Sequence, residues 1–259
     1  MELDFALIVI LLLTGLGAGT VDAMAGGGGL ITLPVLLATG MSPVEALATN
    51  KLQGSFGTFA ASRYFVKHQL VDLKQMRGMI ISTFIGAVVG TVLVQLLDTS
   101  MLAKVMPGLL VLIALYFMFS PRISDQDSER RISTGLFTGL IVSTIGFYDG
   151  FFGPGTGTFF TIAFVSLAGF SLARATAHTK ILNFTSNIAS LIFFALGGHI
   201  VWLAGMIMAV GQLVGGQIGA KLVVSKGTRL IRPLIVVVTL AMSAKLLNDQ
   251  FGEHLLGML

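Results

Sequence analysis

Apolar blocks recur along the whole chain, and this pattern restricts the fold more than any other feature of the sequence. Hydrophobic residues make up 54% of the 259 residues and charged residues only 11%, whereas a soluble domain carries roughly a quarter charged residues. A helix that crosses a bilayer needs about 20 mostly apolar residues, and several blocks reach that length with their flanks. The blocks cover residues 5–19, 30–38, 79–97, 105–119, 135–147, 159–169, 188–196, 201–213 and 234–246. We therefore predict an all-α polytopic membrane protein.

Charge, cysteine content and the first residues mainly exclude other classes of protein. The net charge of +4 does not predict a nucleic-acid partner, because the basic residues lie in short loops between apolar blocks. The absence of cysteine excludes disulfides and thiolate metal sites. The first apolar block follows Glu2 and Asp4 rather than the basic segment of a removable signal peptide, so we expect it to be the first membrane span. The longest polar stretch, residues 121–131, is too short for a soluble domain.

Two weakly similar halves emerge when Asp22 is aligned with Asp149, because glycine, proline and lysine positions then keep their order. The matched pairs are Gly26 and Gly153, Gly28 and Gly155, Lys51 and Lys180, Gly86 and Gly215, and Pro107 and Pro233. Internal repeats are common in membrane transporters. We infer a first membrane repeat at residues 1–120, a linker at 121–131 and a second membrane repeat at 132–259, with about five helical segments in each.

The distribution of basic residues predicts that the two repeats are inverted. Lysine and arginine gather in cytoplasmic loops, and here they gather at residues 67–77, 121–131, 173–180 and 225–232. These loops are not at equivalent places in the two repeats, as expected if each repeat crosses the membrane an odd number of times. We therefore predict that both termini lie outside the cytoplasm. The second segment of each repeat is short, so eight to ten spans are expected.

Glycine-rich breaks interrupt the apolar sequence at equivalent places in the two halves, at residues 26–29 and at Gly153 and Gly155. Freed backbone groups cost several kcal/mol each in lipid unless protein, water or a ligand satisfies them. A helix that restarts after such a break directs its amides and the positive end of its dipole at the same place, which favours an anion. The alternative is that the glycines only permit close helix packing, as we expect for Gly86, Gly90, Gly215 and Gly219.

Two lysines lie inside apolar helices that follow the breaks. A lysine within the membrane is costly and by default marks a functional site. Asn183 and Asn187 share a helix face with Lys180, and Asn50 and Gln53 lie beside Lys51. Amide groups with a nearby cation suit a small oxyanion. The alternative is that the lysines extend to the interface or simply neutralise the aspartates near the breaks.

These observations define the candidate site, for which we expect no catalytic residue, no metal and no cofactor. The expected partners are a small anionic substrate and the lipid bilayer, with a second copy of the chain left open. The candidate substrate-binding residues are Gly26, Gly27, Gly28, Gly29, Asn50, Lys51, Gln53, Gly153, Gly155, Lys180, Asn183 and Asn187. The candidate proton-coupling residues are Asp22, Asp149 and His178, whose alternative roles are to cap the breaks or to line an entrance.

The motifs resemble the sulfite exporter TauE/SafE family of membrane permeases. The resemblance rests on DAMAGGGGLITLPVLLATGMSPVEALATNKLQGSFG at residues 22–57, on FYDGFFGPGTG at 147–157 and on ARATAHTKILNFTSN at 173–187, and it covers essentially the whole chain. The sequence looks closest to the uncharacterised bacterial inner-membrane branch of that family. The resemblance implies transport, usually export, of sulfur-containing anions such as sulfite or small organosulfonates.

Two other functions remain open at the level of the sequence. Asp22 and Asp149 could form the dyad of an intramembrane aspartyl protease, although the companion Gly-x-Gly-Asp motif is absent. The chain could also be a structural membrane module without a ligand. If it transports, the absence of a nucleotide-binding motif leaves a secondary carrier with alternating access, or a channel.

Overall fold

The computed structural model describes residues 4–102, 104–106, 108, 112 and 126–226, and every regular element in these ranges is a helix. The prediction of an all-helical protein is therefore confirmed for this part of the chain. The expected last segment of the second repeat, 234–246, lies outside the described residues, as does most of 105–119. The helices are α1 (Phe5–Ala25), α2 (Gly28–Ala38), α3 (Pro43–Lys67), α4 (Arg77–Gln95), α6 (Thr134–Leu136), the π-helical turn η1 (Phe137–Val142), α7 (Ser143–Phe151), α8 (Thr156–Ser166), α9 (Leu172–Leu196) and α10 (Trp202–Lys226).

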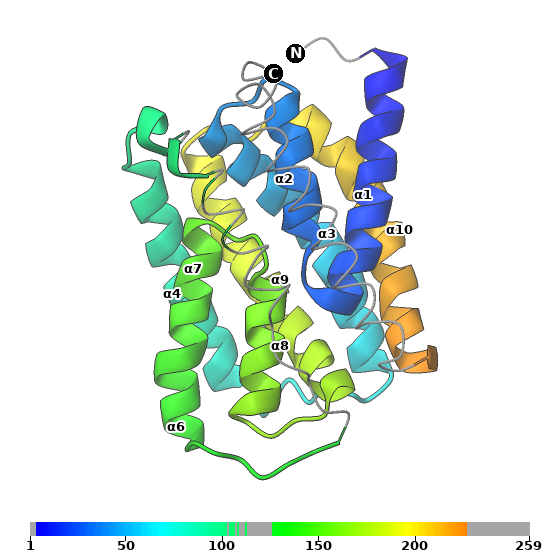
Figure 1. The fold of residues 1–259 in the computed structure, drawn as a ribbon, viewed down its shortest axis with the longest axis vertical. Coiled ribbons are helices and arrows are strands. Elements are labelled where there is room, and N and C mark those ends of the chain that lie inside the picture. The colour runs from blue at the N-terminus through cyan, green and yellow to red at the C-terminus, as the bar shows by residue number, and fades with distance from the viewer. Residues whose placement is uncertain (1–3, 103, 107, 109–111, 113–125, 227–259) are drawn as a thin grey trace, which may run out of the picture.

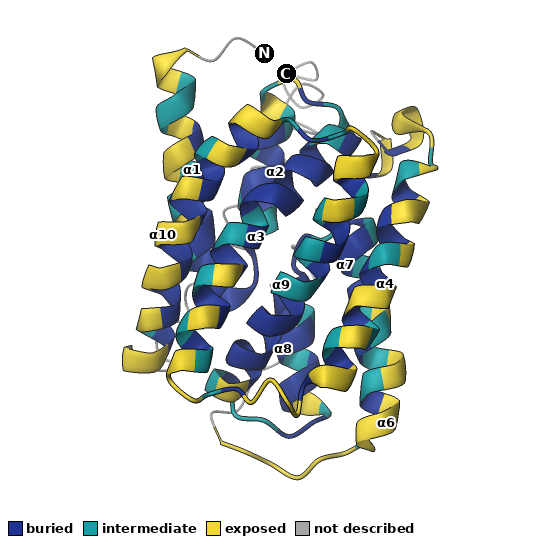
Figure 2. Cartoon of the chain, turned by 180° about the vertical axis from the view of Figure 1, so that it is seen from behind, coloured by how far each residue is buried: buried dark blue, intermediate teal, exposed yellow. Residues whose placement is uncertain are grey.

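Four of the described helices, α1, α4, α9 and α10, are long and apolar enough to cross a membrane. Their outward faces carry exposed apolar side chains such as Ile85 on α4 and Val210 on α10, and Figure 2 shows exposed residues along the outer surfaces of the bundle. Helices α2 and α8 have 11 residues each. Each is therefore about 16 Å long, or about half the thickness of the hydrocarbon core.

Local signals explain where the helices around the breaks begin and end. Helix α1 ends at Ala25 and is capped by Gly26, whose left-handed backbone (φ 80°) is readily adopted only by glycine. Helix α3 begins with a capping box in which Ser42 and Glu45 bond to each other's backbone N–H, and Pro43 takes the first helical position. The start of α3 is thus fixed a few residues after α2 ends.

The two halves of the chain are interleaved. Helix α1 packs mainly on α10, and α4 packs mainly on α7, while α3 and α9 pack on each other between these pairs. In Figure 1, α1 begins at the top of the view and runs downward, whereas the stretch from α6 to α7 begins at the bottom and runs upward. Helix α2 lies in the upper half of the molecule and α8 in the lower half. The breaks that precede α2 and α8 are therefore both placed in the interior.

Glycines allow the outer helix pairs to approach closely, as the sequence indicated. A Cβ at Gly90 would lie 2.1 Å from the carbonyl oxygen of Phe147 on α7. At Gly215 a Cβ would lie 2.2 Å from the carbonyl oxygen of Leu16 on α1. Any side chain at these positions would therefore push the helices apart.

Substituting Gly15 by valine is expected to destabilise the α1–α10 contact, because its Cβ would lie 2.3 Å from the carbonyl oxygen of Met208. Overpacking of this kind costs about 1–3 kcal/mol. Gly17, two residues away on the exposed face of α1, has no atom within 4 Å of such a Cβ and provides the matched control. Thermal unfolding in detergent should show a clearly lower Tm for Gly15→Val than for Gly17→Val. Equal Tm values would mean that this contact is not as close as described.

Candidate functional site

The two helix breaks touch each other in the interior of the protein. A Cβ at Gly26 would lie 2.3 Å from the carbonyl carbon of Gly157, so the two backbones cross in direct contact. The hydroxyl of Thr158 donates a 2.6 Å hydrogen bond to the carbonyl oxygen of Ala25 across this crossing. Thr158 therefore satisfies one of the carbonyl groups that the end of α1 leaves free.

A small cavity lies beside the crossing. Its volume is about 40 Å³, on a scale on which one water needs about 10–15 Å³, so it has room for a few water-sized groups. Every residue that lines it is polar, charged or glycine, in a molecule that is otherwise largely apolar. The lining residues are Asp22, Gly26, Gly28, Gly29, Asn50, Lys51, Gln53, Gly54, Thr58, Asp149, Gly153, Thr156, Gly157, Asn183, Asn187 and Gln212.

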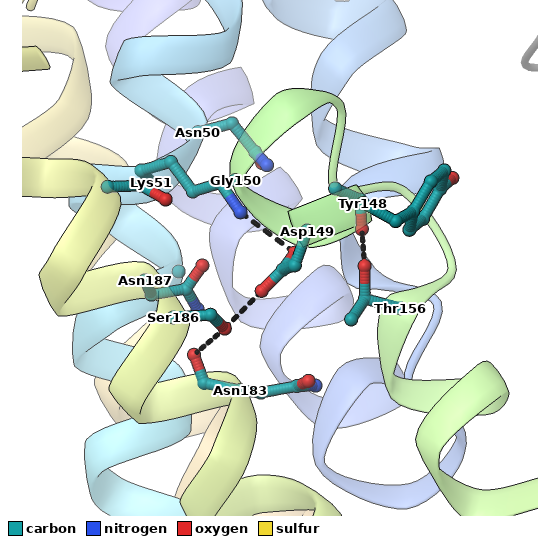
Figure 3. A network of polar contacts seen from close by, with 12 residues as sticks. Asn50, Lys51, Tyr148, Asp149, Gly150, Thr156, Asn183, Ser186 and Asn187 are labelled. Atoms are coloured by element: carbon teal, nitrogen blue, oxygen red, sulfur yellow. Dashed lines mark hydrogen bonds and ion pairs between the residues drawn. The ribbon is translucent and has the colours of Figure 1, made fainter. Parts of the chain in front are cut away.

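Two buried ion pairs connect the halves of the chain at this cavity. The ammonium of Lys51 on α3 lies 2.8 Å from Oδ1 of Asp149 on α7, as Figure 3 shows. The ammonium of Lys180 on α9 lies 3.0 Å from Oδ2 of Asp22 on α1. Both lysines are 1% exposed. Each lysine therefore neutralises the aspartate of the other half, which was the alternative role considered for the lysines.

The second oxygen of each aspartate also has a partner. The hydroxyl of Ser186 on α9 donates to Oδ2 of Asp149, and the two side chains meet in Figure 3. Oδ1 of Asp22 accepts a 3.2 Å hydrogen bond from the backbone N–H of Gly28, the first residue of α2. We expected the N-terminal amides after the breaks to face a ligand, but at Gly28 a carboxylate of the protein takes this place.

The amide side chains at the cavity are only partly satisfied. Oδ1 of Asn50 accepts from Nε2 of Gln53 at 2.6 Å and from the hydroxyl of Thr32 at 2.5 Å. Oε1 of Gln53 and Oδ1 of Asn183 are buried and have no hydrogen-bond partner among the described protein atoms. Most buried polar groups in proteins are paired. The unused capacity of these two amides therefore points to water or a ligand in the cavity.

Most of the residues predicted from the sequence line this cavity. They are Asp22, Gly26, Gly28, Gly29, Asn50, Lys51, Gln53, Asp149, Gly153, Asn183 and Asn187. Gly27 and Gly155 lie at the breaks but not in the lining, and Lys180 reaches the site only through its ion pair. His178 packs against the rings of Phe164 and Phe170, and its Nδ1 lies 2.8 Å from the carbonyl oxygen of Arg174, so the structure does not bring it to the cavity.

Some lining residues were not predicted. Thr156 and Gly157 directly follow the second break, where the start of α8 reaches the cavity. Gln212 comes from α10. A Cβ added at Gly57 on α3 would lie 2.2 Å from Oε1 of Gln212, so this side chain lies directly against α3. A single glutamine in an apolar block was the available signal for Gln212.

Within the described part of the chain, no three acidic or histidine side chains come together as a metal site would need.

Comparison with known proteins identifies similar sequences that extend over nearly the whole chain. Residues 11–246 match the profile of the family described as "Sulfite exporter TauE/SafE". The chain is 47% identical over 250 residues to "Probable membrane transporter protein YfcA" of Escherichia coli K12. The aligned region covers 96% of this chain and 93% of that protein. It is 46% identical over 254 residues to a "Probable membrane transporter protein" of Haemophilus influenzae, with 98% and 100% covered. A Bacillus subtilis protein with the same description, YunE, is 24% identical over 266 residues, with 93% and 97% covered. No solved structure matches the chain.

Proposed function

Because the chain belongs to the sulfite exporter TauE/SafE family of membrane transporters, we propose that it exports a small sulfur-containing anion, such as sulfite or an organosulfonate, as a secondary carrier. The observation that carries the proposal is the polar cavity between the two helix breaks. Buried polar groups in a membrane protein are costly and mark the path of a substrate or ion. The cavity size fits a small anion, and unsatisfied amides together with the ammonium of Lys51 offer hydrogen bonds to its oxygens.

We propose alternating access between two inverted repeats, and several features of the structure support it. Helices α2 and α8 have 11 residues each, and α3 and α9 have 25 each. Lys51 and Lys180 are each the ninth residue of their helix. Each ion pair joins a lysine of one half to the aspartate of the other half. The helix packing follows the same rule, since the first helix of each half packs on the fourth segment of the other half, α1 on α10 and α7 on α4. In transporters with inverted repeats, one repeat rocks against the other around a site at the midplane.

The proposed orientation places the N-terminus outside the cytoplasm and the linker inside. The basic stretches 67–77 and 126–131 lie at the bottom of Figure 1, at the end of the bundle opposite to the start of α1. The expected basic loop at 173–180 is instead the first part of α9, and its Lys180 is buried. Because cytoplasmic loops carry the excess of lysine and arginine, this end is assigned to the cytoplasm.

Cysteine labelling tests this orientation in a chain that has no native cysteine. Ser100, after α4, and Glu129, in the linker, are both exposed. A membrane-impermeant maleimide should label Ser100→Cys in spheroplasts and should label Glu129→Cys only after lysis. The reverse pattern would invert the topology, and labelling of both before lysis would place the two positions on the same side.

The structure favours transport over intramembrane proteolysis. An aspartyl protease needs two carboxylates that share one proton. Here Asp22 and Asp149 each hold a lysine of their own and a further hydrogen-bond donor. A purely structural module would have no reason to keep a cavity lined only by polar groups and glycine.

Flux into proteoliposomes tests the proposal. The purified full chain should move radiolabelled sulfite or an organosulfonate faster than protein-free vesicles, in a panel that also contains sulfate, carboxylates and phosphate, with and without a pH gradient. Flux of carboxylates alone would replace the substrate class. No flux of any anion in the panel would contradict the proposed function.

A further inference from the structure

The charges around the cavity balance before any substrate enters. Asp22, Asp149 and Lys51 line the cavity, and Lys180 is bound to Asp22 just outside the lining. Two carboxylates therefore face two ammonium groups. Burying an additional charge without compensation is strongly unfavourable. A bound anion would leave this buried cluster with one uncompensated negative charge, so it needs a positive charge to enter with it.

The two ion pairs differ in what they face. Both members of the Lys51–Asp149 pair line the cavity. In the other pair only Asp22 does, and its second oxygen is bound to the first amide of α2. The ammonium of Lys51 is therefore the cation that a substrate in the cavity can reach. To bind it, the substrate has to take the place of the Asp149 carboxylate.

Resting on the transport function proposed above, we propose that the substrate anion and one proton bind together at the Lys51–Asp149 pair. The anion becomes the partner of the Lys51 ammonium. Oδ1 of Asp149, released from that ammonium, takes up a proton from hydronium or a buffer acid in the solution, whose bond to that proton breaks. No other bond is made or broken, and the cavity cluster stays neutral. Release on the other side of the membrane reverses both steps and restores the ion pair.

The surroundings of Asp149 leave it as the proton acceptor. Helix α3 brings Lys51, and α9 brings the hydroxyl of Ser186 and, farther along, Lys180 in its own ion pair. The neighbouring Tyr148 donates its hydroxyl to the carbonyl oxygen of Pro154 at 2.6 Å. Helix α8 has no titratable side chain, and the only one in α4 is Arg77 at its first residue. Near Asp149, α4 instead brings Ala87 against Gly150, and the hydroxyl of Thr91 donates to the carbonyl oxygen of Gly150.

This coupling fixes the sign of the pH dependence. The anion binds to the form in which Asp149 carries a proton, so raising the pH weakens binding. Where Asp149 is ionised in the empty protein, the apparent affinity should fall about tenfold per pH unit. Transport of a monovalent anion with one proton moves no net charge, so the membrane potential should not drive it. Export in this mode requires an outward gradient of the anion that exceeds any inward gradient of protons.

Calorimetric titration of the purified full chain with methanesulfonate tests the proposal, because this anion stays ionised across the physiological pH range. Titrations in two buffers that differ in ionisation enthalpy should show one proton taken up for each anion bound. In Asp149→Asn we expect no proton uptake and an affinity that no longer changes with pH. Asp127→Asn is the control: it removes a carboxylate from an exposed ion pair with Arg174 outside the cavity, and should keep both properties.

The outcomes separate this inference from the proposed function. Binding by the unmodified protein without proton uptake, or binding that requires sodium instead, would overturn the inference and leave anion transport standing. An Asp149→Asn protein that folds and retains the pH dependence would overturn it as well. If Asp149→Asn does not fold, the proton count of the unmodified protein still decides. Failure of every anion in the flux panel would instead contradict the proposed function itself.

Discussion

Replacing Lys51 by alanine is expected to abolish anion flux and to lower the free energy of unfolding by about 3–5 kcal/mol, because it leaves a buried carboxylate without its partner. Lys51 and Asp149 are both almost inaccessible to solvent, and their charged atoms lie 2.8 Å apart. Thermal unfolding in detergent and flux in proteoliposomes measure the two effects. Lys67→Ala removes an exposed lysine from the end of the same helix and should change neither.

The double variant Lys51→Ala/Asp149→Ala separates stability from function. Removing both charges leaves no uncompensated ion, so most of the lost stability should return. The substrate still loses a charge-assisted hydrogen bond worth about 1.5–3 kcal/mol, so its affinity should remain about ten- to a hundredfold weaker. Recovery of both stability and full flux would mean that Lys51 serves only to neutralise Asp149.

Lys51→Arg is not expected to restore transport fully. A planar guanidinium replaces a compact ammonium, and the space around that ammonium is limited. A Cβ at Gly153, for example, would lie only 3.1 Å from Nζ of Lys51. Reduced flux at near-normal stability is the expected result.

The helical class, the breaks and many of the residues that line the cavity could be predicted because their signals are local in the sequence. Runs of apolar residues report the solvent, and glycine clusters report an interruption of the helix wherever it occurs. Asn50 and Gln53 could be assigned to the surroundings of Lys51 because helical spacing fixes their positions relative to it. All three line the cavity.

Which lysine pairs with which aspartate could not be predicted, because the pairing depends on how distant segments pack. Nothing in the sequence near Lys51 indicates that it binds Asp149, which lies 98 residues away. Residues 43–67, which form α3, are absent from the apolar blocks, because this helix carries several buried polar residues. Four of them, Asn50, Lys51, Gln53 and Thr58, line the cavity rather than face lipid. The equal position of Lys51 and Lys180, each the ninth residue of a 25-residue helix, also depends on helix boundaries that were not predicted from the sequence.

Substituting Gly26 by alanine is expected to reduce flux severely, because two independent costs arise at this residue. Its backbone is left-handed with φ of 80°, which costs other residues about 1–2 kcal/mol. The new Cβ would also lie 2.3 Å from the backbone of Gly157 and would force the two breaks apart. The breaks form one wall of the cavity, so displacement should disturb binding as well as folding. Flux and Tm should both fall.

Gly27→Ala is the matched control for Gly26→Ala, since both change a glycine of the same run. Gly27 has an ordinary φ of −108°, and the nearest atom to its Cβ is Cδ1 of Leu30 at 3.9 Å. If close contact between the breaks is what function requires, Gly27→Ala should keep its Tm and most of its flux. Equal losses in both variants would mean that flexibility of the whole run matters instead. Normal flux in Gly26→Ala would contradict a cavity built on this crossing, because alanine cannot occupy that position without moving one break away from the other.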